Sequence, residues 1–526
     1  MMRKKLQLVA TLCLLAFSVN SYAQRYLAQI FTSVTVTPNV VYGNNISNSI
    51  LTAGNNVPTD LKMDVYQPAN DSNTARPLVI VLHTGSFMPT VINGQPTGSK
   101  SDSAVVEMCT RFAKRGYVAV AADYRLGWNP VSTNQDARTG TLLQAVYRSI
   151  QDAKNCVRFF KNDKATTNTY LIDTTKIAVG GLGSGGYIAL AYASLNQLSE
   201  IQLGKFIDNS TTPPRPYVDQ DTLGNFDGTN TAYRCTPNYA THSSKINMVF
   251  NIGGAVGDLS WIQAGEVPVV ALQCVNDPNA PYKTGAVIVP TTGDFVVEAS
   301  GSYDVIRVSD SLNNNSIFLH SIYNDVYTAK ANIFNDGHEA LYPFVTPAAA
   351  GAITCGSGST YPQLPETEQG APWDWWNESA YSATATAYGQ SGPTVACNAL
   401  TGNPDMSATK GRKYIDTIQG YLNPRIVCAL GLPGCVPNPA GINEYSAASE
   451  LSIFPNPSST EINFSVQGSN TIKSVELYDV TGRMVKQVVG LNTQKYTIQR
   501  AGLATGLYIS KIQLNKGSIS KKIILE

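Results

Sequence analysis

Charged side chains are scarce in this chain of 526 residues, and neither sign of charge dominates. Asp, Glu, Lys and Arg make up 14% of the residues, and 38 basic residues stand against 37 acidic ones. Apart from the three basic residues at 3–5, the sequence has no run of like charges and no basic stripe. Proteins that bind nucleic acids or anionic membrane surfaces carry such basic patches. The composition therefore predicts no nucleic-acid partner.

Metal-binding cysteine pairs are also missing. None of the nine cysteines forms a C-x-x-C pair, which argues against a structural zinc site. No cofactor or metal motif is evident elsewhere, so we predict neither a cofactor nor a metal. Histidine is rare as well, which leaves few candidates for a catalytic base. The four histidines are His83, His242, His320 and His338.

Long apolar runs are absent after the N-terminus, so we do not expect an integral membrane protein. The N-terminus itself has a basic start at residues 3–5, an apolar core from Leu6 to about Val19, and the small residues Ser21 and Ala23. This order predicts a secretory signal peptide over residues 1–23. The alternative, a membrane anchor, needs about 20 apolar residues and lacks such a cleavage-type ending.

Cys13 lies in the predicted signal peptide, and export would place the other eight cysteines in an oxidising compartment. An even number of cysteines there suggests disulfides. Cys428 and Cys435 enclose a short loop that contains Gly and Pro, and we predict that they are linked. Cys355 and Cys397 are a second candidate pair. Cys109 and Cys156 fall in predicted helices, where buried thiols are an alternative to disulfides.

Strand and helix patterns alternate through the middle of the chain, which indicates βαβ units and a mostly parallel sheet flanked by helices. We assign residues 24–437 to this α/β domain, with insertions at 200–244 and 287–332 where lids or pocket walls are expected. The predicted strands are 30–41, 61–66, 77–83, 117–124, 177–180, 246–252 and 268–274, and the predicted helices are 103–114, 141–162, 187–195 and 410–430.

The C-terminal part has a different pattern. A polar segment, residues 438–450, reads as a linker, and short alternating strands follow within 451–526. Turn signals at 479–482 and 504–506 separate these strands. Such spacing predicts a small all-β sandwich that folds separately.

The segment Ile177–Tyr187 carries the chemistry of the sequence. An apolar strand runs into Gly180-Gly-Leu-Gly-Ser-Gly-Gly186, and a helix-forming run follows. This is the layout of a nucleophile elbow, the strand-turn-helix that holds a serine at the top of a parallel sheet. Counting G-x-Nuc-x-G from Gly181 places Gly183 at the nucleophile position. Ser184 occupies that position only if Leu182 takes the place of the first glycine, which is costly at a tight turn.

Four segments around this elbow occur in the order seen in the α/β-hydrolase superfamily, and they most resemble its carboxylesterase and feruloyl-esterase-like branch. They are Leu61–Pro68, Leu82–Phe87, Asp123–Leu126 and the elbow itself. The resemblance implies the α/β-hydrolase fold and catalytic groups in the chain order nucleophile, acid, histidine.

On this resemblance the catalytic candidates are Ser184 as nucleophile, Asp277 as acid and His338 as base. Asp277 precedes Pro278, so a turn-forming role is its alternative, and His338 has a hydrogen-bonded surface histidine as its alternative. The implied oxyanion-hole donors are the N–H groups of Gly85, Ser86 and Gly185. Relatives often have His-Gly-Gly-Gly here, whereas this chain has Thr84 at one of the glycine positions, and His83 is expected to hold the loop in place.

Residues 371–377 contain three of the five tryptophans, Trp373, Trp375 and Trp376. Tryptophan faces stack on sugar rings or aromatic acyl groups, but such clusters also serve as core packing or loop anchors. We name these three as candidate substrate-binding residues.

The C-terminal domain resembles the type A sorting domain of the type IX secretion system. The resemblance rests on Phe454–Pro457, Leu477–Arg483, Gly506–Tyr508 and Lys521–Leu525, which lie in the expected order. It implies passage through the periplasm and outer membrane to the cell surface or medium, with the secretion machinery as a partner. An immunoglobulin-like carbohydrate or adhesion module is the alternative.

Together these features predict a secreted serine ester hydrolase that acts on small-molecule or glycan-linked esters outside the cell. The alternative is a catalytically degenerate hydrolase fold that serves as a cell-surface binding module, because Gly183 holds the preferred nucleophile position. With Ser184 only beside that position, we expect hydrolysis that is weak or absent.

Overall fold

The computed structural model describes residues 25–526 except 290–291, 347–352, 355–359, 362–368, 401, 438–450, 468–469, 480–482, 501 and 516. The predicted signal peptide and the predicted linker lie outside the described residues. The chain divides into two compact units, Met1–Val436 and Pro437–Glu526, and each is described by itself.

The first unit is built on one sheet of eight strands in the order β1-β2-β4-β3-β5-β8-β10-β13. The strands are β1 (Val34–Ser47), β2 (Val57–Pro68), β3 (Arg76–Leu82), β4 (Val118–Ala122), β5 (Ile172–Leu182), β8 (Met248–Ile252), β10 (Val269–Cys274) and β13 (Leu341–Phe344). β2 pairs antiparallel with β1 and β4, and every other pair is parallel. The predicted mostly parallel sheet is confirmed.

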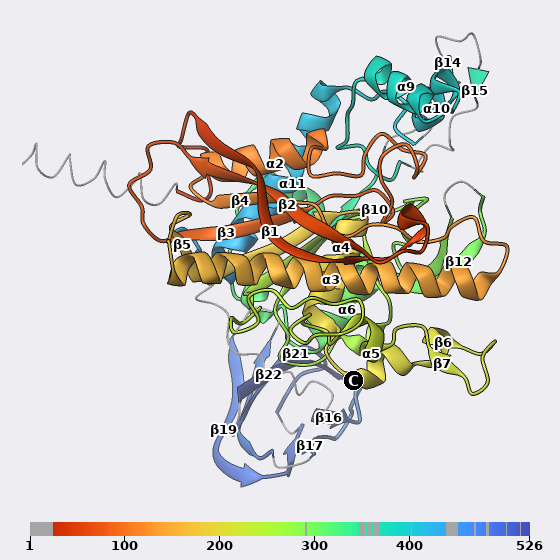
Figure 1. Cartoon of the computed structure of the whole chain (residues 1–526). Coiled ribbons are helices and arrows are strands. Elements are labelled where there is room, and N and C mark those ends of the chain that lie inside the picture. The colour runs from red at the N-terminus through yellow and green to blue at the C-terminus, as the bar shows by residue number, and fades with distance from the viewer. Residues whose placement is uncertain are drawn as a thin grey trace, which may run out of the picture. The chain divides into compact units, whose positions relative to one another are not determined.

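Helices cover both faces of this sheet (Figure 1). α2 (Ser103–Lys114) and α11 (Ala408–Ala429) pack on each other and on one face. α3 (Gln135–Ala165), α4 (Ser184–Ser194) and α6 (Ser302–Ser311) cover the other face. Right-handed crossovers between parallel strands place helices in this way, and the carboxyl ends of the strands then form one edge where ligands bind.

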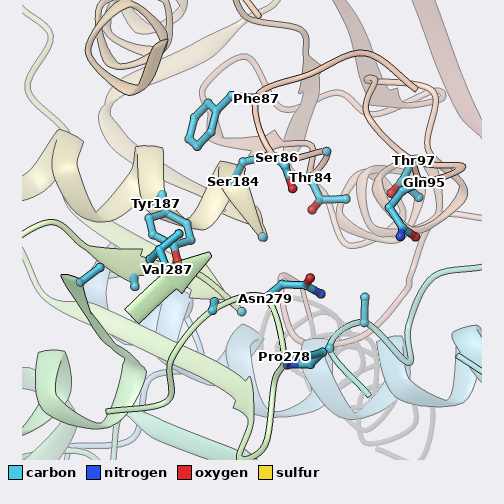
Figure 2. A pocket seen from close by; sticks show the side chains of 18 of the residues that line it. Thr84, Ser86, Phe87, Gln95, Thr97, Ser184, Tyr187, Pro278, Asn279 and Val287 are labelled. Atoms are coloured by element: carbon cyan, nitrogen blue, oxygen red, sulfur yellow. The ribbon is translucent and has the colours of Figure 1, made fainter. Parts of the chain in front are cut away.

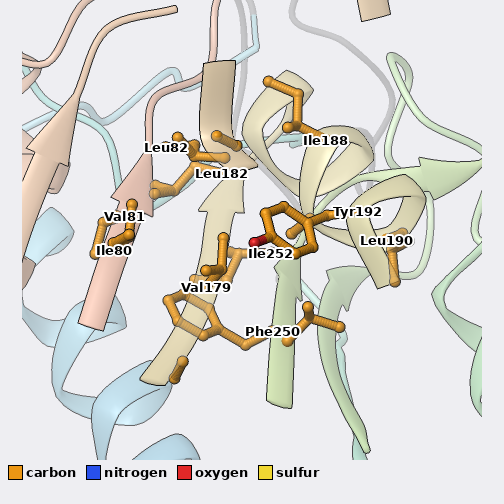
Figure 3. Packing of buried hydrophobic residues seen from close by; sticks show 14 of the residues in the cluster. Ile80, Val81, Leu82, Val179, Leu182, Ile188, Leu190, Tyr192, Phe250 and Ile252 are labelled. Atoms are coloured by element: carbon orange, nitrogen blue, oxygen red, sulfur yellow. The ribbon is translucent and has the colours of Figure 1, made fainter. Parts of the chain in front are cut away.

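The core explains why the central strands read as continuous apolar runs. All seven residues of β3 and all five of β8 are buried, because helices shield both of their faces. Figure 3 shows β3, β5 and β8 side by side, with Phe250 and Ile252 beside Val179 and Leu182, and the side chains of α4 packed on them. This packing fixes the position of the turn between β5 and α4.

Shorter elements fill the two predicted insertions and the segment before α11. The first insertion holds β6 (Ile207–Asp208), β7 (Arg215–Pro216) and α5 (Gln220–Leu223). β9 (Ala255–Val256), β11 (Thr284–Ile288) and β12 (Phe295–Gly301) form a three-stranded sheet. Other short helices and strands are α7 (Ser316–Leu319), α8 (Val326–Ala331), β14 (Ile353–Thr354), β15 (Thr360–Tyr361), α9 (Glu378–Ala387) and α10 (Gly392–Ala399). None of the helices among the described residues is long and apolar enough to cross a membrane.

The predicted disulfide between Cys428 and Cys435 is present and ties the end of α11 to the loop that follows it. Cys109, Cys156, Cys235 and Cys274 are buried free thiols. Cys355 lies outside the described residues, so its pairing with Cys397 stays a prediction.

Replacing both Cys428 and Cys435 by serine is expected to lower the free energy of unfolding by about 2 kcal/mol, because the cross-link removes entropy from the unfolded chain. Urea denaturation of the wild type and the double variant measures this difference. Wild-type protein with a reductant is the control and should be no more stable than the variant, since a reductant also opens the predicted Cys355–Cys397 pair. Superimposable unfolding curves with and without the cross-link would contradict the expectation.

The second unit is all β, with one sheet of β16 (Leu451–Phe454), β17 (Glu461–Val466) and β20 (Lys495–Gln499). A second sheet contains β18 (Ile472–Asp479), β19 (Met484–Thr493), β21 (Gly506–Leu514) and β22 (Gly517–Leu525). All strand pairs within these two sheets are antiparallel. Alternating residues such as Ile462, Phe464 and Val466 form a core of this unit's own.

Candidate active site

The turn between β5 and α4 shows which residue occupies the nucleophile position. Leu182 ends β5, Ser184 begins α4, and Gly183 lies between them with φ 50° and ψ −116°. A positive φ at this turn is the strained conformation in which the elbow exposes its nucleophile. Gly183 therefore stands at the nucleophile position, and the elbow has the unshifted register.

Close packing of the backbone holds the elbow in this register. A Cβ atom on Gly181 would lie 2.6 Å from the carbonyl oxygen of Leu82, and one on Gly185 would lie 2.3 Å from the same oxygen. Both positions therefore exclude any side chain. The shifted register would place Leu182 where Gly181 now passes the end of β3, and a leucine does not fit there.

Thr84 fills the space beside Gly183. A Cβ atom on Gly183 would lie 2.1 Å from Thr84 Oγ1 and 3.0 Å from Thr84 Cβ. A serine at residue 183 would thus require the Thr84 side chain to rotate away or to be replaced. The threonine at residue 84, where relatives often have glycine, is therefore sterically compatible with glycine at residue 183 but not with serine there.

Ser184 is 5% exposed, and its Oγ lies 2.9 Å from the hydroxyl of Tyr124. The Tyr124 hydroxyl donates its single proton to the carbonyl oxygen of His83 at 2.9 Å, so Ser184 is the donor to Tyr124. Burial raises the pKa of Tyr124 far above its usual value, so this phenol stays neutral. A neutral phenol does not remove a proton from serine, and Ser184 has no general base in this arrangement.

The loop after β3 keeps the form of an oxyanion loop. Gly85, Ser86 and Phe87 all have positive φ, at 117°, 52° and 58°. Their carbonyl oxygens accept hydrogen bonds from Met88 N at 2.9 Å, Trp128 Nε1 at 2.8 Å and the N–H of residue 127 at 2.7 Å. These bonds hold two residues other than glycine in a strained conformation.

The N–H groups of this loop remain available. Among the described residues, no acceptor is bonded to the backbone N–H of Gly85, Ser86 or Ser184. An oxyanion hole combines a donor of this loop with the N–H of the residue after the nucleophile position. In the observed register that residue is Ser184 rather than Gly185, which the sequence had suggested.

His338 lies far from the elbow. It precedes Leu341, the first residue of β13, and so belongs to the amino ends of the parallel strands, whereas Gly183 is at the carboxyl ends. Across β5, β8, β10 and β13 the level of Leu182 corresponds to that of Tyr342. At about 3.3 Å per residue along a strand and about 4.8 Å between strands, more than about 15 Å separates His338 from Gly183.

His338 has a partner of its own at that edge. Its Nδ1 lies 2.5 Å from Asp310 Oδ2, and Asp310 Oδ1 accepts a hydrogen bond from Asn315 Nδ2 at 2.9 Å. The ring also makes an edge contact with Tyr303, with centroids 5.9 Å apart. The structure therefore joins His338 to Asp310, not to Asp277 or Ser184, and the three candidates do not form a triad.

Asp277 does lie at the carboxyl end of β10, where the resemblance places an acid. Its Oδ1 accepts hydrogen bonds from the N–H groups of Asn279 and Ala280 at 2.8 and 3.2 Å, as a turn-forming aspartate does. Burial raises the pKa of Asp277 to about 7, and these two bonds only partly offset that rise. Its carboxyl is close to the Tyr187 hydroxyl, whose pKa it raises further.

A cavity of about 400 Å³ opens over the elbow. Figure 2 shows Thr84, Ser86 and Phe87 of the oxyanion loop, Ser184 and Tyr187 of α4, and Pro278 and Asn279 around one space. The second insertion contributes a wall through Val287, Ile288, Val297 and Ala299, whereas no residue of the first insertion lines it. Most lining side chains are apolar, and no histidine is among the described ones.

The three candidate tryptophans have different surroundings. Trp376 lines the cavity, and its indole Nε1 is buried with no acceptor among the described residues. Trp373 is 1% exposed and packs on Phe344. Trp375 stacks beneath the Arg412 guanidinium, 5.3 Å from it. Trp376 alone remains a candidate for ligand contact.

Asp374 is a cavity residue that the sequence analysis did not identify. Its side chain lines the cavity, and the residue is 5% exposed. Burial raises the pKa of its carboxyl to about 7. The sequence did hold one sign of this role. Asp374 stands between Trp373 and Trp375, and a carboxylate flanked by large aromatic residues indicates a buried acid rather than a solvated one.

Asp374→Asn is expected to make the protein more stable than the wild type at pH 8, by about 2–4 kcal/mol, and equally stable near pH 4. The raised pKa means that the folded state binds more protons than the unfolded state between pH 4 and 7, so stability falls as the pH rises through this window. The asparagine removes that charge. Urea unfolding at pH 4.5, 6 and 8 measures the effect, with Asp221→Asn, at an exposed residue, as control. If the free energy of unfolding of wild type and Asp374→Asn varied with pH in parallel, the expectation would be refuted.

The described residues contain no group of three or more His, Cys, Asp or Glu side chains that could hold a metal ion. The cavity offers backbone N–H groups, the carboxyl of Asp374 with its raised pKa, and apolar walls. Such a site suits a small uncharged or carbonyl-bearing ligand rather than a metal centre.

Two family models match parts of this chain. Residues 63–288 match the family described as BD-FAE, and residues 452–526 match the secretion system C-terminal sorting domain. This chain is an esterase-like α/β-hydrolase with a type IX sorting domain. The protein is exported by that system to the cell surface or medium.

Solved structures similar to this hydrolase include several of Thermogutta terrifontis esterase 2. The paraoxon-phosphorylated form is 18% identical, with 48% of this chain and 74% of that chain covered and a TM-score of 0.29. The apo form is also 18% identical, with 48% and 75% covered and a TM-score of 0.29. The propionate-bound form is 18% identical, with 48% and 75% covered and a TM-score of 0.28. Among curated proteins, none matches the chain.

Proposed function

We propose that this exported hydrolase fold binds an acyl ester, or the carboxylic acid derived from it, without hydrolysing it through a serine triad. The observation that carries the proposal is Gly183 at the nucleophile position, with φ 50° and ψ −116°. Glycine has no side chain with which to attack a carbonyl carbon. The catalytically degenerate binding module is therefore favoured over the serine hydrolase.

Two further observations support the loss of hydrolysis. Ser184 donates its proton to Tyr124, a neutral phenol, and His338 is paired with Asp310 at the opposite edge of the sheet. A serine without a base is a weak nucleophile at neutral pH. Binding would persist, because the groups that bind an ester are separate from those that cleave it.

The cavity keeps what an ester needs for binding. The N–H groups of Gly85, Ser86 and Ser184 can donate to a carbonyl or carboxylate oxygen. Phe87 and Trp376 offer aromatic surface to the acyl group. A volume of about 400 Å³ is at the lower end of the range for small-molecule sites, so one aromatic acyl group or a short acyl ester fits.

A serine ester hydrolase that acts on extracellular esters, including glycan-linked ones, is the second candidate. Ser184 favours it, since this residue does line the cavity. It would require Ser184 to exchange Tyr124 for a base and the elbow to shift by one residue.

Titration with methyl cinnamate, an aromatic ester, tests the proposal. We expect quenching of tryptophan fluorescence with a Kd of about 1 mM or tighter, and no release of cinnamic acid on chromatography. Trp376→Ala should weaken binding severalfold, whereas the matched control Trp375→Ala, which lies outside the cavity lining, should not. Release of cinnamic acid that is lost in Ser184→Ala would establish the hydrolase instead, and absence of binding would overturn the ester as ligand.

A further inference from the structure

A second cavity, of about 340 Å³, lies on a different part of the first unit. One wall is α3, the second is the loop of residues 127–129, and the third is the turn of residues 48–54. The polar side chains that line it are Asn48, Ser49, Asn129, Thr141, Gln144 and Arg148. Thr141, Gln144 and Arg148 follow an i, i+3, i+7 spacing, which brings them to one face of α3.

Arg148 is the unusual member of this lining. It is 2% exposed, and the only hydrogen bond of its guanidinium to a described residue runs from Nη2 to the carbonyl oxygen of Gly127 at 2.9 Å. Among the described residues, its Nε is buried without a hydrogen-bond partner, and no carboxylate forms an ion pair with it. A buried guanidinium normally has its donors satisfied and its charge compensated, so Arg148 lacks a partner.

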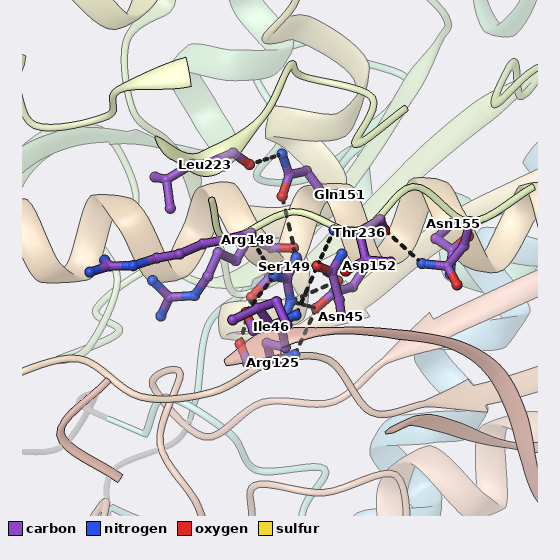
Figure 4. Close-up of polar contacts among 12 residues, drawn as sticks. Asn45, Ile46, Arg125, Arg148, Ser149, Gln151, Asp152, Asn155, Leu223 and Thr236 are labelled. Carbon is purple, nitrogen blue, oxygen red and sulfur yellow. Dashed lines mark hydrogen bonds and ion pairs between the residues drawn. The ribbon is translucent and has the colours of Figure 1, made fainter. Parts of the chain in front are cut away.

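The nearby carboxylate is already used. Asp152 pairs with Arg125, whose Nη2 lies 2.8 Å from Asp152 Oδ1 and whose backbone N–H bonds Oδ2 at 2.9 Å. Figure 4 shows Arg125 bonded to Asp152 beside Arg148. Arg234 adds a third positive charge, and its Nε is likewise buried with no partner in the part of the chain that the structure describes. The cluster therefore has three guanidinium groups and one carboxylate.

Electrostatics agree with this count. The pKa of Arg148 is lowered to about 9, mainly by burial and also by the charge of Arg125, and Asp152 offsets only part of this effect. An anion in the cavity would compensate the charge and satisfy the free donors at the same time.

We propose that this cavity binds a small hydroxylated carboxylic acid, with its carboxylate on Arg148 and its hydroxyl groups on the amide and hydroxyl side chains of the wall. The planar guanidinium matches a carboxylate through two parallel hydrogen bonds. The buried side-chain carbonyl oxygen of Asn129 has no hydrogen-bond partner among the described residues, so it can accept from a ligand hydroxyl. The volume admits one monosaccharide-sized molecule.

The site is distinct from the cavity over the elbow. Trp128 lines both cavities and separates them, and its Nε1 is fixed by the bond to the Ser86 carbonyl oxygen. Binding of an acid at Arg148 requires neither Gly183 nor the binding or hydrolysis of an ester in the first cavity. Loss of ester binding and loss of acid binding are therefore independent results.

Calorimetric titration of the full chain with D-galacturonate, a hydroxylated carboxylate, tests the proposal, with D-galactose and inorganic sulfate as comparison probes. We expect galacturonate to bind with a Kd of about 1 mM or tighter and the other two to bind at least about tenfold more weakly. Arg148→Met should weaken galacturonate binding about 10- to 100-fold, the range for a hydrogen bond to a charged group.

Arg138→Met is the matched control, because Arg138 is a buried arginine of the same helix outside both cavity linings. Its guanidinium bonds the carbonyl oxygens of Ser132 and Phe295, so this variant should lose thermal stability but keep galacturonate binding. Arg148→Met without ligand should melt at the same temperature as the wild type or higher, since it removes an uncompensated buried charge. If Arg148 had only a structural role, Arg148→Met would instead melt at a lower temperature than the wild type.

Asn129→Leu is a second variant, chosen because the Asn129 side chain makes no hydrogen bond to a described residue. It should weaken galacturonate binding severalfold and leave the melting temperature unchanged. Failure of the wild type to bind galacturonate, equal binding of sulfate, or unchanged affinity in both Arg148→Met and Asn129→Leu would each overturn the proposal.

Discussion

Wild-type protein is expected to remain unlabelled by a fluorophosphonate probe and to cleave short-chain nitrophenyl esters no faster than buffer does. Ser184→Ala should change neither result. The probe reacts with serines that a base has activated, and Ser184 instead donates to the neutral hydroxyl of Tyr124. Gel fluorescence after labelling measures the first effect, and nitrophenol absorbance measures the second.

A pair of variants sharpens this test at the elbow. Gly183→Ser alone places a Cβ atom against Thr84 Oγ1, whereas Gly183→Ser with Thr84→Gly provides room for the serine. The single variant should lose stability, and the double variant should recover part of it, with Gly183→Ala plus Thr84→Gly as the matched control. Labelling of the double variant should stay slow, because no histidine lines the described cavity. Strong wild-type labelling that disappears in Ser184→Ala would overturn the degenerate elbow.

Deletion of residues 451–526 is expected to abolish appearance of the protein at the cell surface or in the medium. These residues contain the sorting domain, and the truncated chain should accumulate before the outer membrane. The first unit should still fold, since the deleted strands have a hydrophobic core of their own. Immunoblots of the periplasmic, surface and medium fractions measure the distribution, and circular dichroism of the truncated protein measures its folding.

The complementary control transfers residues 438–526 to a periplasmic reporter protein, which should then reach the surface or medium. Normal export of the truncated chain would show that sorting information lies elsewhere. An unfolded truncated chain would contradict the separation of the two cores.

Much of the fold could be predicted from the sequence, because the apolar patterns of its segments match their burial in the structure. The run 77–83 is apolar at every position except its final histidine, since β3 is covered on both faces, and the helix predicted at 103–114 coincides with α2. The sorting domain was accessible for a related reason. Its motifs mark turns and strand ends of a small sandwich, and these depend on local residues rather than on distant ones.

The site was only partly accessible. Asp277 was placed correctly after a strand, because the apolar run before it predicts β10. His338 was assigned by its chain order and its neighbouring glycine, but the four-residue strand β13 follows it rather than precedes it. A strand of four residues is too short to show a clear sequence pattern. Whether His338 lies at the amino or the carboxyl ends of the strands depends on whether it comes before or after that strand.

The sequence by itself determined that this chain is an α/β-hydrolase with a sorting domain, and that its elbow offers either Gly183 or Ser184 to a ligand. Only the tertiary structure decided between the two residues, because the contact that excludes a side chain comes from the carbonyl oxygen of Leu82, on a different strand. It likewise brought Thr84 beside Gly183 and, within the described residues, paired no carboxylate with Arg148. Contacts of this kind join residues far apart in the chain, and no local pattern records them.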